Sequence, residues 1–288
     1  MIMGEGSWRR EISLITLSEN TAGTIGLLGE WGLGILVDVD GQKILFDTGP
    51  GVSAVHNAEA MGQDLSKVDK IVLSHGHFDH TGGLRNVLDR MRKKVDVFAH
   101  PDVWGAKYGG LAAANIYRYV GIPFQKEELE TRGASFILEK GPVWLSESVV
   151  ATGEIPMVTE YEQIEPRLFV KQGDKFVNDP VPDDRALIIK TDLGLVVIAG
   201  CAHRGIINTL YYAQELTGEK RIHMVVGGIH LLHASEEQRE LTIAALKQLR
   251  VKRIGVSHCT GLPASVRMAQ ELGDSFFFNN AGSVVTFP

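Results

Sequence analysis

The chain has 288 residues, 44% of them hydrophobic and 22% charged, with a formal net charge of −6 at pH 7. These values describe an ordinary globular protein with a sizeable core, and the negative charge argues against general attraction to nucleic acid or to anionic membranes. The N-terminal stretch MIMGEGSWRREISLITL has no secretory signal pattern, and no apolar run approaches the roughly 20 residues that span a bilayer. With two cysteines only, we expect a reduced, cytoplasmic protein rather than a disulfide framework.

The first third of the chain alternates between strand and helix patterns. Short apolar runs predict strands over 12–17, 34–39, 43–46, 70–73 and 95–99, and one-sided apolar spacing predicts helices over 52–61 and 84–94. The segment from about 100 to 135 is rich in glycine, alanine and aromatic residues, and we interpret it as an inserted helical flap.

The remainder continues with strands over 143–152, 168–171, 186–191 and 195–199, followed by alternating helices (206–216, 236–249, 264–272) and strands (222–226, 253–256, 276–278, 284–287). No linker or repeat interrupts this order. We therefore predict a single α/β domain over residues 1–288, made of two mixed sheets packed face to face with helices outside.

The stretch SHGHFDH at residues 74–80 follows the apolar run 70–73 directly. His75 and His77 alternate in an extended loop and can bind one metal ion, while Asp79 and His80, past the bend, can point at a second one. Imidazole suits Zn, Fe, Co, Ni or Cu, and a carboxylate adds a hard oxygen. The alternative is a chance cluster of surface histidines at a helix start, with Asp79 as its cap.

These residues match the signature His-x-His-x-Asp-His, and the chain resembles the metallo-β-lactamase superfamily in three further motifs: LFDTGPG (45–51), VVIAGCAH (196–203) and GVSHCTG (255–261). The resemblance implies an αβ/βα sandwich. It also implies that Asp47 supports the ligand loop from behind, that His258 binds the second metal, and that the motif at 196–203 delivers a metal-bridging residue.

Within the superfamily, seven stretches are similar to the dihydropterin ribofuranosyl-aminobenzene 5′-phosphate synthase-like branch: GEWGLGILVD, ILFDTGPG, LSHGHFDHTGGL, TGEIP, GCAHRGIINT, GGIHLL and SHCTG. They extend from about residue 17 to residue 261. This similarity implies a C–N bond-forming synthase that joins a dihydropterin diphosphate to a ribofuranosyl-aminobenzene phosphate.

Two departures from the superfamily pattern leave ligands undecided. The usual third-motif histidine is missing, and His100, Glu154 and the Asp183-Asp184 pair, with Asp184 preferred, are the candidates to replace it. The bridging aspartate is missing as well. Cys201 occupies its place, with His203 as a competing ligand, and an unliganded buried Cys201 is the alternative.

Further residues are candidates for contact with substrate. His230 follows a predicted strand and could be an outer ligand, a general acid or a phosphate-binding group, or could merely cap the strand. Arg204 begins a helix whose N-terminal amides could hold a phosphate. Asn20 could line the same pocket, and Tyr117 in the flap could stack on a planar ring.

The sequence therefore predicts an enzyme with two divalent transition-metal ions, zinc first and iron, manganese or nickel next, in which Asp79 orients a water molecule and His230 assists. Its substrate is a small phosphorylated metabolite, with a pterin among the candidates. The alternatives are a metal-dependent hydrolase of phosphodiesterase type and, from another class, a redox or metal-sensing protein.

Overall fold

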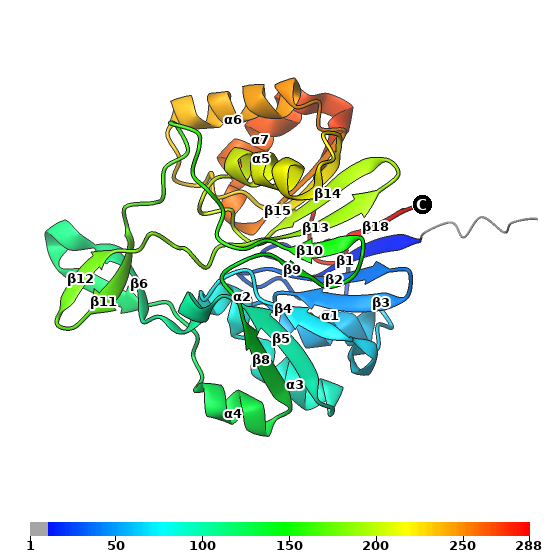
Figure 1. Ribbon diagram of the computed structural model, residues 1–288, viewed down its shortest axis with the longest axis vertical. Helices are drawn as coiled ribbons and strands as arrows, with labels where there is room; N and C mark the ends of the chain where they lie inside the picture. Colours follow the sequence, from blue (N-terminus) through cyan, green and yellow to red (C-terminus); the bar gives the residue numbers. More distant parts are fainter. Residues whose placement is uncertain (1–10) are drawn as a thin grey trace, which may run out of the picture.

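Two seven-stranded sheets form the body of the protein (Figure 1). The computed structural model describes residues 11–288; residues 1–10, the start of the stretch in which we found no secretory signal, lie outside the described part. The first sheet has the order β18-β1-β2-β3-β4-β5-β8. Its strands are β1 (Ile12–Ser18), β2 (Gly34–Val39), β3 (Gln42–Phe46), β4 (Lys70–Val72), β5 (Val95–Ala99), β8 (Ala134–Leu138) and β18 (Val284–Phe287).

The second sheet has the order β17-β16-β15-β14-β13-β10-β9, and its strands β14 to β17 are parallel. Its strands are β9 (Val143–Trp144), β10 (Val149–Ala151), β13 (Ala186–Thr191), β14 (Gly194–Ala199), β15 (Ile222–Gly228), β16 (Arg253–Ser257) and β17 (Phe276–Phe278). The helices between them are α5 (Ile206–Thr217), α6 (Glu236–Gln248) and α7 (Leu262–Leu272), and those of the first half are α1 (Ser53–Ala60), α2 (Phe78–Thr81), α3 (Leu84–Met91) and α4 (Lys126–Thr131).

The two sheets pack face to face, with helices outside. One apolar cluster joins Ile35 and Phe46 of the first sheet to Leu187 and Val196 of the second. The outer face of the second sheet packs on α5, α6 and α7, at the top of Figure 1, and the outer face of the first packs on α1 and α3. Because both faces of each sheet are covered, central strands such as β14 are buried along their whole length. The predicted sandwich is confirmed.

The segment that we interpreted as a helical flap is mostly not helical. It contains the hairpin of β6 (Lys107–Leu111) and β7 (Ile116–Tyr119), which joins β11 (Leu168–Gln172) and β12 (Lys175–Asn178) in a four-stranded sheet that projects from the body, at the left of Figure 1. Of the segment, only α4 and single 3-10 turns are helical. The strand predicted over 143–152 is likewise divided into β9 and β10.

Aromatic pairs across strands explain why this segment forms a sheet. The ring of Tyr117 stacks on Phe176 with centroids 3.8 Å apart, and Tyr108 meets the same ring edge-on at 4.9 Å. Gly110 allows the hairpin strands to approach, since a Cβ there would lie 2.0 Å from the carbonyl oxygen of Ile116. Cross-strand pairs of this kind need partners on β11 and β12, which local sequence patterns do not reveal.

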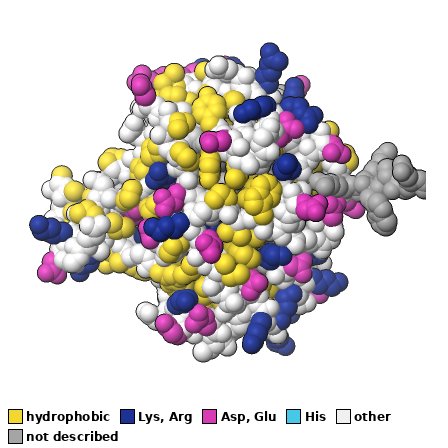
Figure 2. Space-filling view, in the orientation of Figure 1, with side chains coloured by type: hydrophobic (Ala, Val, Ile, Leu, Met, Phe, Trp, Pro, Cys, Tyr) yellow, Lys and Arg dark blue, Asp and Glu magenta, His cyan; other side chains and the backbone are white. Residues whose placement is uncertain are grey.

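On the face shown in Figure 2, acidic and basic side chains are mixed, without a continuous basic patch. In residues 11–288, no helix is both long and apolar enough to cross a bilayer. That residues 1–288 form one domain stays a prediction.

A buried ion triad ties the projecting sheet to the body. Lys107 Nζ on β6 lies 2.7 Å from Asp183 Oδ1 and 3.0 Å from Asp179 Oδ2, and all three side chains are almost fully buried. Burial acts to lower the pKa of Lys107, but the two carboxylates raise it above its usual value. The second oxygen of Asp183 accepts from the amide of Gly76, inside the stretch SHGHFDH. The projecting sheet is therefore linked directly to the histidine loop.

We expect Lys107→Met to lower the free energy of unfolding by about 3–5 kcal/mol, because it leaves two carboxylates buried without their cation. Denaturant unfolding monitored by circular dichroism measures this loss. The control is Lys126→Met, which breaks the exposed pair with Glu130 on α4 and should change stability by no more than about 0.5 kcal/mol. Similar values for the two variants would contradict the structural role of the triad.

Candidate metal centre

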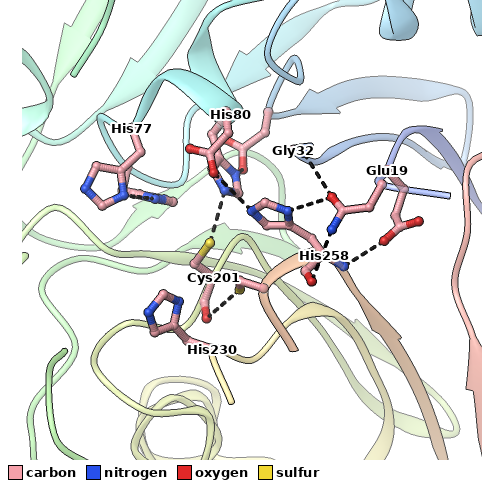
Figure 3. A network of polar contacts seen from close by, with 12 residues as sticks. Glu19, Gly32, His77, His80, Cys201, His230 and His258 are labelled. Carbon is pink, nitrogen blue, oxygen red and sulfur yellow. Dashed lines mark hydrogen bonds and ion pairs between the residues drawn. The ribbon is translucent and has the colours of Figure 1, made fainter. Parts of the chain in front are cut away.

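The polar residues singled out in the sequence meet at one edge of the sandwich. Each follows the carboxyl end of a strand: Asp47 follows β3, the histidine loop follows β4, Cys201 follows β14, His230 follows β15 and His258 follows β16. In parallel sheets these ends lie side by side, so residues far apart in the chain converge there. Both sheets contribute, and Figure 3 shows the side chains pointing toward one another.

His75 lies at the centre of the first group of side chains. Its Nε2 is 2.9 Å from His77 Nδ1 and 3.2 Å from His203 Nε2, while its Nδ1 bonds to Ser74 Oγ at 2.8 Å. Burial, reinforced by the neighbouring imidazoles, holds the pKa of both His75 and His203 well below its usual range, and burial lowers that of His77 to about 3. These imidazoles are therefore neutral, which is the form that binds metals.

Asp47 holds the loop from behind. Its Oδ1 accepts from the amide of Ser74 at 2.7 Å, and its Oδ2 accepts from Ser74 Oγ at 2.6 Å and from His80 Nδ1 at 2.7 Å. Nε2 of His80 then faces Cys201 Sγ at 3.1 Å. Burial acts to lower the pKa of His80, but the Asp47 carboxylate raises it to about 9. Metal binding at this nitrogen would consequently release a proton.

His258 is fixed from the opposite side. Its Nδ1 bonds to Asn20 Oδ1 at 2.9 Å, its backbone amide donates to Glu19 Oε1 at 2.7 Å, and its Nε2 lies 3.2 Å from Asp79 Oδ2 (Figure 3). Glu19 is almost fully buried, and burial raises its pKa. Asn20 thus orients His258. A substrate-binding residue would have to project freely into a pocket, and the amide of Asn20 does not.

Cys201 is common to all the groups of potential ligands in residues 11–288. Its Sγ and the ring nitrogens of His75 and His203 lie within 4.8 Å of one another, and the same holds for Cys201, His80 and His258. Asp79, through its contact with His258, adjoins the second group. His203 is thus the additional imidazole that lies beside His75 and Cys201.

The candidates to replace the missing third-motif histidine lie elsewhere. His100 caps the 3-10 helix Pro101–Trp104 by accepting from the amide of Asp102, and its other nitrogen contacts Glu154. Asp184 Oδ2 accepts from the amide of Arg204 at 2.9 Å, and burial raises the pKa of Asp184 to about 7. Within residues 11–288, neither Asp184 nor Glu154 belongs to a group whose ligand atoms converge.

The two groups fit transition-metal ions. Nδ1 of His77 faces His75 Nε2 at 2.9 Å, and Nε2 of His258, which makes no hydrogen bond to the described residues, faces the Asp79 carboxylate at 3.2 Å, so both nitrogens lie where ligands of a cation would lie. Nitrogens that share one tetrahedral zinc ion stand about 3.3 Å apart, close to the 3.2 Å between His75 and His203. Nδ1 of His75, His80 and His258 each bonds to a neighbouring side chain, which fixes the orientation of the ring.

Strained backbone accompanies these positions. Asp47, Ala202, His230 and His258 adopt positive φ values of 59°, 51°, 47° and 53°. Non-glycine residues rarely adopt this conformation, and it costs on the order of 1–3 kcal/mol at each position. Four such residues beside one cluster indicate that its side-chain directions are imposed by the surrounding fold.

A family model described as "Metallo-beta-lactamase superfamily" matches residues 32–215. The chain belongs to the metallo-beta-lactamase superfamily. This family is metal-dependent, in agreement with the donor set at the strand ends.

A relative in Methanocaldococcus jannaschii is the 7,8-dihydropterin-6-methyl-4-(beta-D-ribofuranosyl)-aminobenzene-5'-phosphate synthase, to which this chain is 30% identical. The similarity covers 96% of this chain and 97% of the relative. The chain is 31% identical to an uncharacterized protein of the same organism, over 88% of this chain and 92% of the relative. A solved metal-dependent hydrolase of the beta-lactamase superfamily superimposes with a TM-score of 0.81 at 30% identity, covering 95% and 98% of the two chains. The resemblance to the superfamily and to the synthase branch is confirmed.

A cavity of about 220 Å³ lies over the cluster of this metallo-beta-lactamase fold. Its wall includes Trp31, Asp79, His203 and His230. Glu165, Arg167, His230 and His233 line both this cavity and a groove of about 890 Å³. The groove is thus a continuation of the space above the cluster.

Two residues expected to bind substrate have other partners. The guanidinium of Arg204 donates to the carbonyl oxygens of Ile155 and Pro180, bracing two loops. Tyr117 belongs to the aromatic cluster of the projecting sheet and is absent from the cavity wall.

The start of α5, which we expected to hold a phosphate, is occupied by Glu162. Its carboxylate accepts from the amides of Ile207 and Asn208 at 2.8 and 2.9 Å. An anion is thus bound to these amides, but it belongs to the protein. The loop that delivers Glu162 has no regular pattern in the sequence, so this contact was not foreseeable.

Sequence reasoning also missed Glu19, Glu165 and Arg167. Glu19 precedes Asn20, so proximity to a candidate residue was an available signal for it. Glu165 and Arg167 lie outside any motif, before β11, and only the fold brings them to the cavity.

We expect Asp47→Asn to weaken metal binding about 10–100-fold, because the amide cannot accept all the hydrogen bonds that hold Ser74 and His80 in place. Competition with a chromophoric chelator measures the affinity. Asp38→Asn, on the neighbouring strand β2 beside the half-exposed Lys43, serves as the matched control and should keep the affinity of the unmodified protein. Unchanged affinity in Asp47→Asn would show that the loop holds its own shape.

Proposed function

We propose that this chain is an enzyme with a binuclear metal centre that acts on a phosphorylated metabolite. The observation that carries the proposal is the convergence of two ligand groups on Cys201 at the floor of a cavity. The first group comprises His75, His203 and Cys201, with His77 beside His75, and the second comprises His80, His258 and Cys201, with Asp79 beside His258. Zinc is the favoured metal, because imidazole and thiolate together suit it.

Bound metal ions would supply Lewis-acid polarisation of a phosphate oxygen and would lower the pKa of a water molecule. The chain's residues orient the reactants. Asp79 keeps one carboxylate oxygen against His258 and lies in the cavity wall, where it can accept a hydrogen bond from an attacking water or hydroxyl. Burial acts to raise the pKa of Asp79, but contacts with His258 and other nearby histidines hold this pKa below its usual value. The carboxylate is therefore charged, and a hydrogen-bond acceptor, at neutral pH.

The phosphate of the substrate must be held by groups other than the start of α5. Arg167 and His233 both line the cavity and the groove, and we propose that they contact the phosphate. His230 lies beside them, but its Nε2 bonds to Glu165 at 2.9 Å, so it is less free to act on substrate than we expected from the sequence.

The synthase relative supports C–N bond formation with a pterin substrate, because the similarity covers almost the whole of both chains. A second candidate is hydrolysis of a phosphoester, supported by the solved metal-dependent hydrolase at 30% identity and a TM-score of 0.81. The two reactions differ in what attacks: in one, the amine nitrogen of the aminobenzene attacks the carbon that carries the diphosphate, which leaves, and in the other, water attacks the phosphoester. The same metal centre serves either.

We expect about two transition-metal ions per chain after expression in metal-supplemented medium, and both metal content and turnover should fall in His77→Ala. Nδ1 of this histidine lies 2.9 Å from His75 Nε2, beside the first group, and its ring adds little to the apolar core, so the fold should persist. Elemental analysis and circular dichroism provide the measurements. His56→Ala, which alters an exposed histidine on α1, is the control and should retain both ions. Full metal content in His77→Ala would remove this residue from the ligand set.

We expect phosphorylated compounds to be turned over faster than neutral ones by the metal-loaded enzyme. The panel contains five kinds of substrate, assayed under one set of conditions. They are a pterin diphosphate supplied together with the ribofuranosyl-aminobenzene phosphate acceptor, phosphodiesters, lactones, thioesters and β-lactams. Arg167→Gln should raise KM for the phosphorylated compounds about tenfold or more, since it removes a charged hydrogen bond, while metal content stays constant. Faster turnover of lactones or thioesters than of every phosphorylated compound would refute the proposal.

A further inference from the structure

A third group of potential ligands lies next to the two histidine-rich groups. Sγ of Cys201, Sγ of Cys259 and a ring nitrogen of His230 lie within 4.8 Å of one another. These are the two cysteines of the entire chain, and both thiols are buried and free of disulfide. Figure 3 shows His230 on the side of Cys201 opposite to His80. The third group therefore includes two side chains, Cys259 and His230, that neither of the other groups contains.

The fold makes room for the second thiol. Gly228, at the end of β15, has no side chain where a Cβ would lie 2.7 Å from Cys259 Sγ. Any larger residue would push the thiol away from Cys201. The thiol donates a weak hydrogen bond to the carbonyl oxygen of Cys201 at 3.7 Å, and it lies beside the Cys201 thiol and the His230 ring. The sulfur therefore faces the two other potential ligands.

His230 is held as metal-binding histidines usually are. Its Nε2 bonds to Glu165 Oε2 at 2.9 Å, and Glu165 in turn pairs with Arg167. Its Nδ1 is buried without any hydrogen-bond partner among the described residues. A carboxylate on one ring nitrogen fixes the tautomer and the ring orientation and leaves the other nitrogen to bind a cation. With Nε2 taken by Glu165, Nδ1 is the nitrogen that can join the two sulfurs.

We propose that Cys201, Cys259 and His230 form a thiolate-rich metal site, beside the two histidine-rich groups and sharing Cys201 with them, that takes a thiophilic divalent cation. Two thiolates and one imidazole favour soft or borderline ions such as Cd²⁺, Co²⁺ and Zn²⁺ over Mg²⁺ or Mn²⁺. Both thiols lose their protons when the cation binds. Because Cys201 belongs to all three groups, an ion here competes for this sulfur with ions at the other two, so the site biases which metals the centre accepts.

The first test uses the unmodified full-length chain, freed of metal and loaded with one equivalent of Cd²⁺. X-ray absorption at the cadmium edge counts the sulfur ligands per ion. The third group predicts two sulfur ligands, whereas either histidine-rich group offers only one. A count of one or none would overturn the proposal. The measurement requires no substrate, so it is independent of whether the enzyme proves to act on phosphorylated compounds.

The second test uses variants loaded with one equivalent of Co²⁺, whose sulfur-to-cobalt charge-transfer absorption grows with the number of bound thiolates. Cys259→Ser should lower this absorption roughly twofold, because one of two sulfurs is lost, and His230→Gln should weaken Co²⁺ binding at this site. His233→Gln is the matched control, since His233 lines the same cavity but belongs to none of the three groups. Equal absorption in Cys259→Ser and the unmodified protein would overturn the assignment of Cys259.

Discussion

The buried carboxylate of Asp47 is the contact on which the arrangement of the site depends. It is fully buried at the end of β3 and accepts from Ser74 twice and from His80 once. Ser74 in turn orients His75, so one carboxylate sets the direction of a ring in each histidine-rich group. A buried carboxylate is costly unless hydrogen bonds satisfy it, and here the partners that satisfy it are the residues that must be oriented. Its left-handed backbone, at φ 59°, is held by the surrounding sheet.

Both sheets supply side chains to the cluster. The histidine loop belongs to the first sheet, while Cys201, His203, His230 and His258 follow strands of the second. The face-to-face core between the sheets fixes the separation of these two sets of side chains. A close-packed core resists displacement, so small changes between the sheets would alter distances of about 3 Å across the cluster. The apolar interior of the sandwich is therefore part of the site's geometry.

Local order in the chain accounts for what the sequence could predict. The histidine loop, Asp47 and His258 are each tied to a strand end by a short motif, and the strands themselves are marked by apolar runs, so these residues were placed correctly at one edge. The projecting sheet was not recognisable, because Tyr117 and Phe176 meet only after β6 has paired with β11, and a Gly- and Ala-rich segment gives no strand signal of its own. Arg204 and the start of α5 were misjudged because their partners, the carbonyl of Ile155 and the carboxylate of Glu162, lie in an irregular loop about 40 to 50 residues earlier.

Glu165 connects the substrate cavity to the cluster. It bonds to His230 on one side and pairs with Arg167 on the other, and both Glu165 and Arg167 line the cavity and the groove that continues from it. An anion that draws the guanidinium of Arg167 away would leave more of the carboxylate's charge to His230, and thus strengthen that ring as a ligand. Conversely, a cation bound by His230 would hold Glu165 in place and leave the Arg167 side chain freer to meet a phosphate. A cation on His230 and an anion on Arg167 would thus act on the same carboxylate, and any coupling between the two would be reciprocal.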